Sequence, residues 1–230
     1  MRYLSFMCAR FALRKKKLKD VADTLDAEYG PDDEPLYRPR YNVAPTDVAW
    51  IVEYGAHRRA LRPATWNYLV SGGRPLINLR GENVGSGAGY RDAFASRRCA
   101  VVTDGFYEWP GKGLAPFLFH RADDGLVLLG GLFQRAKGDD VHARFTVLTT
   151  RPNALVARVH DRMPVILSVE RLDEWLTAEP AEAATLIGPA PEDALVATAV
   201  SKHVNSVRND DPACVVPSEH DAGPAQRSLF

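Results

Sequence analysis

Short segments rich in β-branched and aromatic residues recur along the chain, separated by turns that contain glycine, proline or aspartate. Such segments are typical of β-strands. We predict strands at 48–54, 60–63, 99–103, 144–149 and 195–200, among others. Only a few stretches space their apolar residues as a helix does. A strand-rich chain of 230 residues with a few short helices favours one α+β domain with mostly antiparallel pairing.

Three local signals refine this prediction. Apolar residues with helical spacing predict an amphipathic helix over about 13–27. The turn Asp123-Asp124-Gly125 between the apolar runs 116–120 and 126–132 predicts a β-hairpin. Residues 217–230 lack such patterns, and we predict a disordered tail there.

Composition and cysteine spacing exclude several classes of protein. Hydrophobic residues make up 46% and charged residues 25%, as in ordinary globular domains, and no apolar run is long enough to span a bilayer. The three cysteines lie far apart, and no histidine pairs with a cysteine or carboxylate at zinc-ligand spacing. We therefore expect a cytoplasmic monomer with no membrane segment, no metal and no cofactor.

Charge is unevenly distributed although the formal net charge is zero. Residues 58–98 contain eight arginines against two acidic residues, a net +6, whereas 170–230 contain four basic against eleven acidic residues, a net −7. This asymmetry fits a basic groove for phosphates on an acidic body. Arginines scattered over a solvated surface explain the counts equally well.

The pentapeptide MCARF at 7–11 offers an unusual chemistry. If the chain begins at Met7 and this methionine is removed, Cys8 carries an α-amine next to its thiol. The reference pKa of an α-amine is about 7.7–8.0, so part of it is nucleophilic near neutral pH. Amine and thiol together condense with an aldehyde to a thiazolidine ring. On this stretch alone a small buried cysteine is favoured, because six residues precede Met7.

Six motifs in order, MCARF, YNVAPT, INLRGEN, RCAVVTDGFYEW, FTVLTTRPNALVARVHDRMPVIL and VNSVRN, resemble the SOS-response-associated peptidase (SRAP) family, also called abasic-site processing proteins. The resemblance covers about Met7 to Val216. It implies a barrel-like, β-rich domain over 8–216 with a central DNA-binding cleft, and an extension over 1–7 that is absent or removed. Ala9 departs from the glycine of the family motif, and 66–76 looks short and altered.

The resemblance also implies roles for single residues in the capture of abasic sites. Cys8 would attack the open-chain aldehyde with its amine and close the ring with its thiolate. Glu108 would transfer protons, and His160 would assist sugar opening or crosslink reversal. Asn78 would hold Cys8 or a sugar hydroxyl. A buried structural carboxylate and a structural histidine are the alternatives for the two titratable residues.

Several residues are predicted to contact single-stranded DNA. Arg10, Arg80 and Arg162 would bind DNA, the first two through phosphates near the lesion. Trp66, Phe106 and Trp109 would stack or wedge against bases. For Trp66, packing in the core is at least as well supported. Asn42, in YNVAPT, is expected to hold the backbone.

The predicted function is an abasic-site sensor of the DNA damage response that forms a covalent crosslink through Cys8, with possible lyase activity, and that joins the nucleoid when bound to damaged DNA. Two other functions remain open at this point. A thiol peptidase would use Cys8, His160 and Glu108, with removal of residues 1–7 as its simplest reaction. A noncovalent single-strand binding module would leave Cys8 inert.

Overall fold

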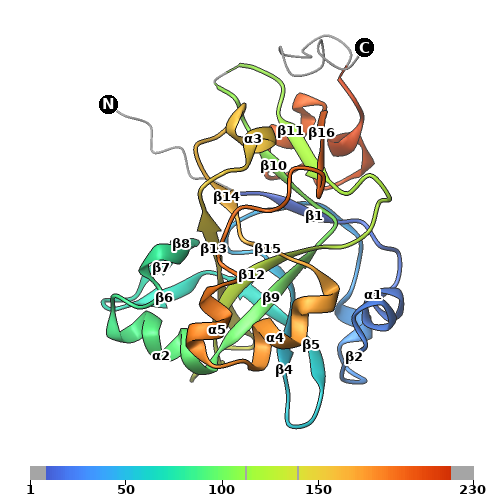
Figure 1. Cartoon of the computed structure of the whole chain (residues 1–230). Helices are drawn as coiled ribbons and strands as arrows, with labels where there is room; N and C mark the ends of the chain where they lie inside the picture. The colour runs from blue at the N-terminus through green and yellow to red at the C-terminus, as the bar shows by residue number, and fades with distance from the viewer. Residues whose placement is uncertain (1–8, 112, 139, 219–230) are drawn as a thin grey trace.

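The computed structural model describes residues 9–111, 113–138 and 140–218 (Figure 1). Five strands form a closed barrel: β4 (Val48–Tyr54), β5 (Arg59–Trp66), β9 (Arg98–Thr103), β12 (Val127–Gln134) and β13 (Ala143–Thr150). The order is β13-β12-β9-β4-β5, all antiparallel, and β5 returns to β13 in parallel through 64–66 and 143–145. The predicted barrel-like core is therefore confirmed.

Shorter strands extend the barrel sheet. They are β2 (Ala27–Glu28), which pairs with β5, β15 (Ile166–Leu167), which pairs with β12, and β8 (Asn78–Arg80) and β14 (Met163–Pro164), which both pair with β13. A separate hairpin consists of β6 (Tyr68–Val70) and β7 (Arg74–Leu76). Strand β13 is thus the barrel strand that pairs both with the INLR segment and with the segment after HDR.

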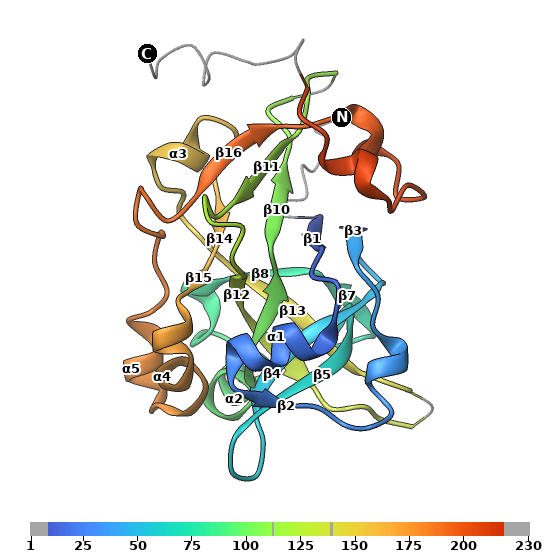
Figure 2. The same ribbon diagram turned by 90° about the vertical axis from the view of Figure 1, so that its right-hand side faces the viewer.

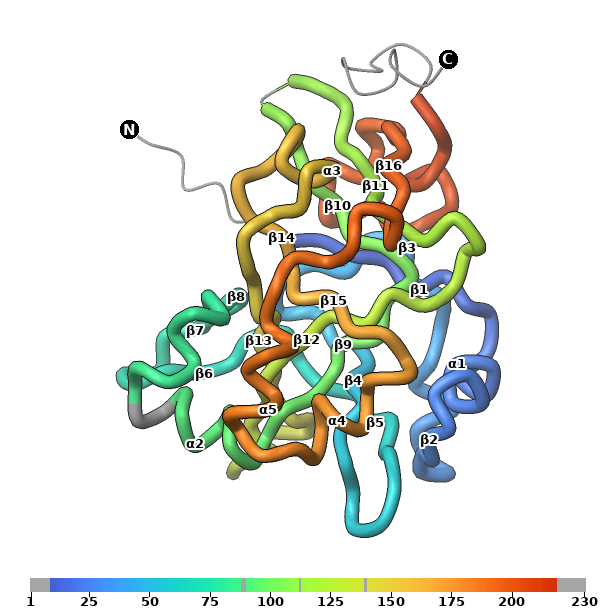
Figure 3. The backbone as a smooth tube through the Cα atoms, in the orientation of Figure 1, coloured from blue at the N-terminus to red at the C-terminus, as the bar shows by residue number. Residues whose placement is uncertain are grey.

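A second sheet lies above the barrel in Figures 1 and 2. Its order is β16 (Val196–Ala199), β11 (Phe117–His120), β10 (Gly105–Glu108), β1 (Phe11–Leu13) and β3 (Arg40–Val43). The tube in Figure 3 follows the segment that leads from α5 beside the barrel up to β16 in this sheet. All pairings in the second sheet are antiparallel.

Short helices cover the outside of the barrel. The α-helices are α1 (Leu18–Leu25), α2 (Ala88–Ser96), α3 (Ala154–Ala157), α4 (Leu172–Thr177) and α5 (Pro180–Ala184). The 3-10 turns are η1 (Glu34–Leu36), η2 (Gly81–Asn83), η3 (Val169–Arg171), η4 (Lys202–Asn205) and η5 (Pro212–Val215). No helix among the described residues is long and apolar enough to cross a membrane.

The alternation of side chains along the strands divides the core in two. In β9, Ala100 and Val102 join the cluster that includes Leu18 and Trp175 of the outer helices. Cys99 and Val101 join the other cluster, which draws on all five barrel strands and on phenylalanines of the second sheet. Because successive side chains of a strand point to opposite faces, this second cluster fills the barrel interior.

Three local predictions need correction. The strands on either side of Asp123-Asp124-Gly125 do not form a hairpin, because β11 pairs with β10 and β16 whereas β12 pairs with β9 and β13. The helix predicted from residue 13 begins at Leu18, because 11–13 form a strand between β10 and β3. The predicted tail begins too early, since Pro217 still bridges to Val200; residues 219–230 lie outside the described structure.

Candidate active site

Strands β1 and β10 bring the MCARF and DGFYEW motifs together. Phe11 lies opposite Phe106, and the Tyr107 amide donates to the Arg10 carbonyl at 3.0 Å. Ala9 and Glu108 each lie two residues beyond the Phe11–Phe106 pair, and Glu108 ends β10 and is 2% exposed. Cys8 and the extension 1–7 lie outside the described residues. The first described residue, Ala9, is therefore next in sequence to Cys8 and lies just beyond the strand that pairs with the predicted proton-transfer carboxylate's strand.

A second pair of motifs meets on strand β13. Asn78 lies opposite Val147 and Arg80 opposite Thr149, so INLRGEN runs parallel to the end of β13. Gly81 continues this segment into η2, where an added Cβ would overlap Ile187 and lie 3.2 Å from the Thr149 carbonyl. Glycine is required there because the backbone passes so close to its neighbours.

The guanidinium of Arg162 fastens this arrangement. It donates to both carboxylate oxygens of Glu82, at 2.6 and 2.7 Å, and to the Thr149 carbonyl at 2.7 Å. These hydrogen bonds lower the pKa of Glu82. The Arg162 side chain is only 15% exposed. Arg162 thus forms an ion pair with the half-exposed Glu82, which the sequence analysis missed, and its contact with DNA stays a prediction.

His160 follows helix α3, and its backbone amide donates to the Val156 carbonyl at 2.9 Å. Its Nδ1 accepts the backbone N–H of Arg162 at 3.1 Å. With Nδ1 as acceptor, the neutral ring carries its proton on Nε2. The side chain is 11% exposed, and the carboxylate of Asp161 lies 3.0 Å from Nδ1, so an imidazolium would have a counterion. The two contacts of Nδ1 require opposite protonation states, since the Arg162 N–H needs a lone pair and the Asp161 carboxylate needs an N–H.

Trp66 connects the two pairs of motifs from inside the barrel. Its ring centroid lies 4.9 Å from that of Phe11, and its Nε1 donates to the Ile77 carbonyl at 2.9 Å. It also stacks on Phe145 and is 0% exposed. This burial favours the alternative given for Trp66, packing in the core, over base stacking. Its burial instead supports the residue before Asn78 and the strand that leads to Arg10.

Burial also disfavours the predicted contact of Phe106 with bases. Phe106 is 0% exposed and stacks on Phe119 across the β10–β11 pairing, with ring centroids 5.2 Å apart. Because Phe106 and Glu108 are two residues apart in a strand, they share one face of the sheet. Phe106 thus contributes apolar surroundings on the side of Glu108 rather than a surface for bases.

Arg10 directly precedes β1 and Trp109 directly follows β10, and the two side chains lie together at this end of the paired strands. The Arg10 guanidinium stands 5.9 Å from the Trp109 ring centroid, and Trp109 Nε1 donates to the Asn205 side chain at 2.7 Å. Arg10 Nη1 also donates to Asn42 and to the Val204 carbonyl, at 2.8 and 2.9 Å. Trp109 is half-buried, so part of its ring remains open for contact with a base.

Asn42 has the structural role that its motif predicted. Its side-chain amide donates to three carbonyls of the VNSVRN segment, at Val204, Ser206 and Asn209, over 2.7–3.1 Å. Its Oδ1 accepts from Arg10. YNVAPT and VNSVRN therefore form one hydrogen-bonded unit that supports the Arg10 and Trp109 pair.

A hollow of about 750 Å³ opens beside INLRGEN. Its wall includes Glu82 of the ion pair and two arginines, Arg91 and Arg151, which the sequence analysis did not select. Arg80 is exposed at the end of β8, close in sequence to this wall. Position in the fold, rather than motif membership, would have been needed to find Arg91, which sits on helix α2.

Solved structures share this architecture. A protein from Bacteroides thetaiotaomicron is 20% identical and superposes with a TM-score of 0.79 over 92% of this chain and 100% of that one. A phage-related protein from Bordetella bronchiseptica is 26% identical, with a TM-score of 0.67 over 84% of this chain and 94% of that one. The barrel with its second sheet is thus a known fold class.

Residues 7–207 match the SOS response associated peptidase (SRAP) family, and the chain belongs to that family. The abasic site processing protein YoqW of Bacillus subtilis is 31% identical over 225 residues, covering 91% of this chain and 99% of that protein. The abasic site processing protein YedK of Escherichia coli is 30% identical over 227 residues, covering 92% of this chain and 100% of YedK. The family resemblance expected from the motifs is confirmed.

Proposed function

We propose that the protein processes abasic sites in DNA and that the mature N-terminal Cys8 captures these sites covalently in single strands. The relatives YoqW and YedK, similar over their full lengths, are named abasic site processing proteins. The family match begins at Met7, so residues 1–6 lie outside it. Removal of 1–7 would give Cys8 the free amine that the chemistry requires.

The observation that carries the proposal is the register of β1 on β10. It pairs Phe11 with Phe106, so that Ala9, the residue that follows Cys8, and the buried Glu108 each lie two residues beyond that pair. A carboxylate that is 2% exposed and ends a strand at this place serves proton transfer to and from the amine. Position 9 is alanine where the family motif has glycine, and a methyl group is the smallest side chain that this departure could add.

The reaction balances in three steps. The Cys8 amine adds to C1′ of the open-chain aldehyde to form a carbinolamine. Glu108 transfers protons so that water leaves and an imine forms. The Cys8 sulfur then adds to the imine carbon and its proton passes to the nitrogen, which closes the thiazolidine. The net reaction joins protein and sugar and releases one water.

His160 and Asn78 have supporting roles in this proposal. The His160 imidazole would donate a proton to the sugar oxygen when the sugar opens, or assist reversal of the crosslink. The Asn78 amide can donate and accept at once, which suits a group that holds the amine or a sugar hydroxyl. Asn78 lies on β8, which pairs with β13. His160 follows Val156 and Val159, which pack in the barrel interior.

The path of the DNA strand is inferred from two accessible side chains, the exposed Arg80 and the half-buried Trp109. Arg80 and Trp109 offer a guanidinium for phosphate and a ring for a base. The hollow with Arg91 and Arg151 begins at Gly81, the residue after Arg80. Single-stranded DNA is favoured because reaching C1′ in a duplex requires unstacking, which costs a few kcal/mol.

The test is crosslinking of an abasic single-stranded oligonucleotide to protein that begins at Cys8, resolved on a denaturing gel. We expect a covalent band that is absent in Cys8→Ser, because a hydroxyl closes only the weaker oxygen analogue. Cys99→Ala is the matched control, since Cys99 is buried in β9. A heat-stable band of equal yield in Cys8→Ser would contradict the proposal.

The family description as a peptidase favours one second candidate, self-removal of residues 1–7. In that case Cys8 would act as a thiol nucleophile assisted by His160 and Glu108. Intact mass separates this from processing by other enzymes. Self-processing requires that Glu108→Gln retain the extension while the wild-type protein, made in the same cells, loses it.

A further inference from the structure

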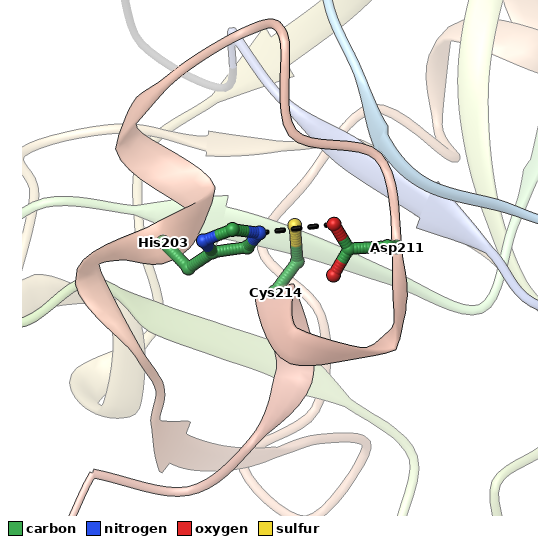
Figure 4. Close-up of side chains that lie close together, drawn as sticks. All are labelled: His203, Asp211 and Cys214. Carbon is green, nitrogen blue, oxygen red and sulfur yellow. Dashed lines mark hydrogen bonds and ion pairs between the residues drawn. The ribbon is translucent and has the colours of Figure 1, made fainter.

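The last part of the described chain brings together three side chains of different chemistry (Figure 4). Turns η4 and η5 carry His203 and Cys214, and Asp211 directly precedes η5. The imidazole, carboxylate and thiol each offer one donor atom, and these atoms lie within 4.8 Å of one another. Seven residues separate His203 from Asp211, and two separate Asp211 from Cys214. This spacing does not match the usual zinc motifs, and the sequence analysis therefore predicted no metal.

We propose that His203, Asp211 and Cys214 form a binding site for a divalent transition metal of the zinc class. Nitrogen, oxygen and sulfur donors together suit a borderline-soft ion and disfavour magnesium or calcium, which prefer oxygen ligands. Three protein ligands leave a fourth tetrahedral position for water. The site lies outside the abasic-site chemistry and goes beyond the proposed function.

Metal binding requires the three donor atoms, which lie within 4.8 Å of one another, to move to ligand spacing and the Asn209 amide to turn. His203 Nε2 and Asp211 Oδ2 are 3.0 Å apart, and zinc bonds of about 2.0 Å at tetrahedral angles separate such ligands by about 3.3 Å. The histidine and aspartate side chains are 36% and 50% exposed, so an ion reaches them from solvent. Cys214 is 0% exposed and forms the inner wall.

Metal binding changes the protonation of two side chains. The Cys214 thiol, which donates to the Asn209 carbonyl at 3.4 Å, loses its proton to solvent and becomes a thiolate ligand. The His203 ring proton moves from Nε2 to Nδ1, so the Asn209 amide nitrogen, now 3.1 Å from Nδ1, must turn away. Thiolate and carboxylate then neutralise the two positive charges of the ion.

The site would fix a segment that supports the candidate active site. Between its ligands lie Val204, whose carbonyl binds Arg10, and Asn205, whose side chain binds Trp109. A bound ion would cross-link both ends of this segment. The expected consequence is a higher melting temperature of the protein, because the ion binds the folded state only.

Cobalt(II) is the probe, because a cobalt–thiolate bond gives a charge-transfer absorption in the near ultraviolet that histidine and carboxylate ligands do not give. The protein used is full-length with Cys8→Ser, which removes the thiol assigned to the abasic-site chemistry. We expect this band to saturate at one cobalt per chain and to be lost when zinc is added. It should be absent in Cys214→Ala and unchanged in Cys99→Ala.

A second variant guards against misfolding of Cys214→Ala. His203→Ala keeps the thiol and should weaken cobalt binding at least tenfold, with melting temperature as the check of folding. Zinc should raise the melting temperature of the Cys8→Ser protein and leave that of both site variants unchanged. Absence of the cobalt band, or a band that persists in Cys214→Ala or at full affinity in His203→Ala, would overturn the proposal.

Discussion

Arg162 and Glu82, eighty residues apart, form a two-point ion pair with both N···O distances below 2.8 Å. The pair joins the turn after INLR to the segment that carries His160. Arg162 also holds the carbonyl of Thr149, so both segments are fixed to the end of β13. A planar guanidinium suits this because it donates to a carboxylate and a carbonyl at once.

Removing the carboxylate should therefore loosen the site more than a surface ion pair would. We expect Glu82→Gln to lower the free energy of unfolding by about 1–2 kcal/mol, because the mostly buried Arg162 loses its charged partner. Glu174→Gln is the matched control: it breaks the exposed pair with Arg171, and we expect a loss of less than about 0.5 kcal/mol. Urea denaturation of the two variants checks this, and equal losses would refute it.

Asp210 should make stability depend on pH at the acid end. Burial opposes ionisation, but backbone amides led by that of Tyr41, together with Arg40 and Arg38, lower the pKa of Asp210. A depressed folded-state pKa contributes stability that is present above the unfolded value of about 3.9 and is lost as pH falls through the folded value.

Asp210→Asn removes this contribution. We expect a lower melting temperature than wild type at pH 7 and a difference that shrinks as pH falls below about 4. Asp92→Asn, which removes an exposed carboxylate of helix α2, controls for the loss of one charge. A difference between Asp210→Asn and wild type that stays constant down to about pH 2 would count against this role.

Trp66 and Trp109 should separate stability from DNA binding. Trp66→Ala should lower the free energy of unfolding by about 3–5 kcal/mol, because it empties the barrel interior. Trp109→Ala should cost much less stability but weaken binding of an undamaged single-stranded oligonucleotide roughly tenfold, if a base stacks on it. Denaturation and fluorescence anisotropy measure the two effects; unchanged DNA affinity in Trp109→Ala would remove this residue from the interface.

The strands could be predicted well from the sequence because strand propensity depends on local composition. Val48–Tyr54 and the buried strand at 99–103 follow from β-branched composition, and the structure confirms them. The face that a side chain occupies is not local. Trp66 and Phe106 are aromatic residues predicted to contact bases, yet strand pairing turns both into the core.

Strand partners were equally hard to predict. The turn at Asp123–Gly125 has the expected residues, and its Gly125 amide donates to Asp123. The strands on either side nevertheless join different sheets, because β11 is held by β10 and β16 while β12 completes the barrel. The Glu82–Arg162 pair depends on the same long-range pairing and leaves no signal in either segment alone.

Single-strand preference gives a further prediction. An abasic oligonucleotide should be crosslinked much faster as a single strand than in an intact duplex, because C1′ in a duplex is reached only after unstacking. The same oligonucleotide annealed to its complement is the matched substrate. Equal rates on the two, followed on denaturing gels, would refute the preference.

Mass spectrometry of the crosslinked peptide tests the central proposal most directly. Protein and abasic single-stranded DNA are reacted, both components are digested, and the DNA-bearing peptide is sequenced. The proposal predicts a peptide that begins at Cys8, with the sugar fragment on that residue and a mass one water below the sum of its parts. A stable crosslink on a chain that still carries residues 1–7, or on any other side chain, would contradict it.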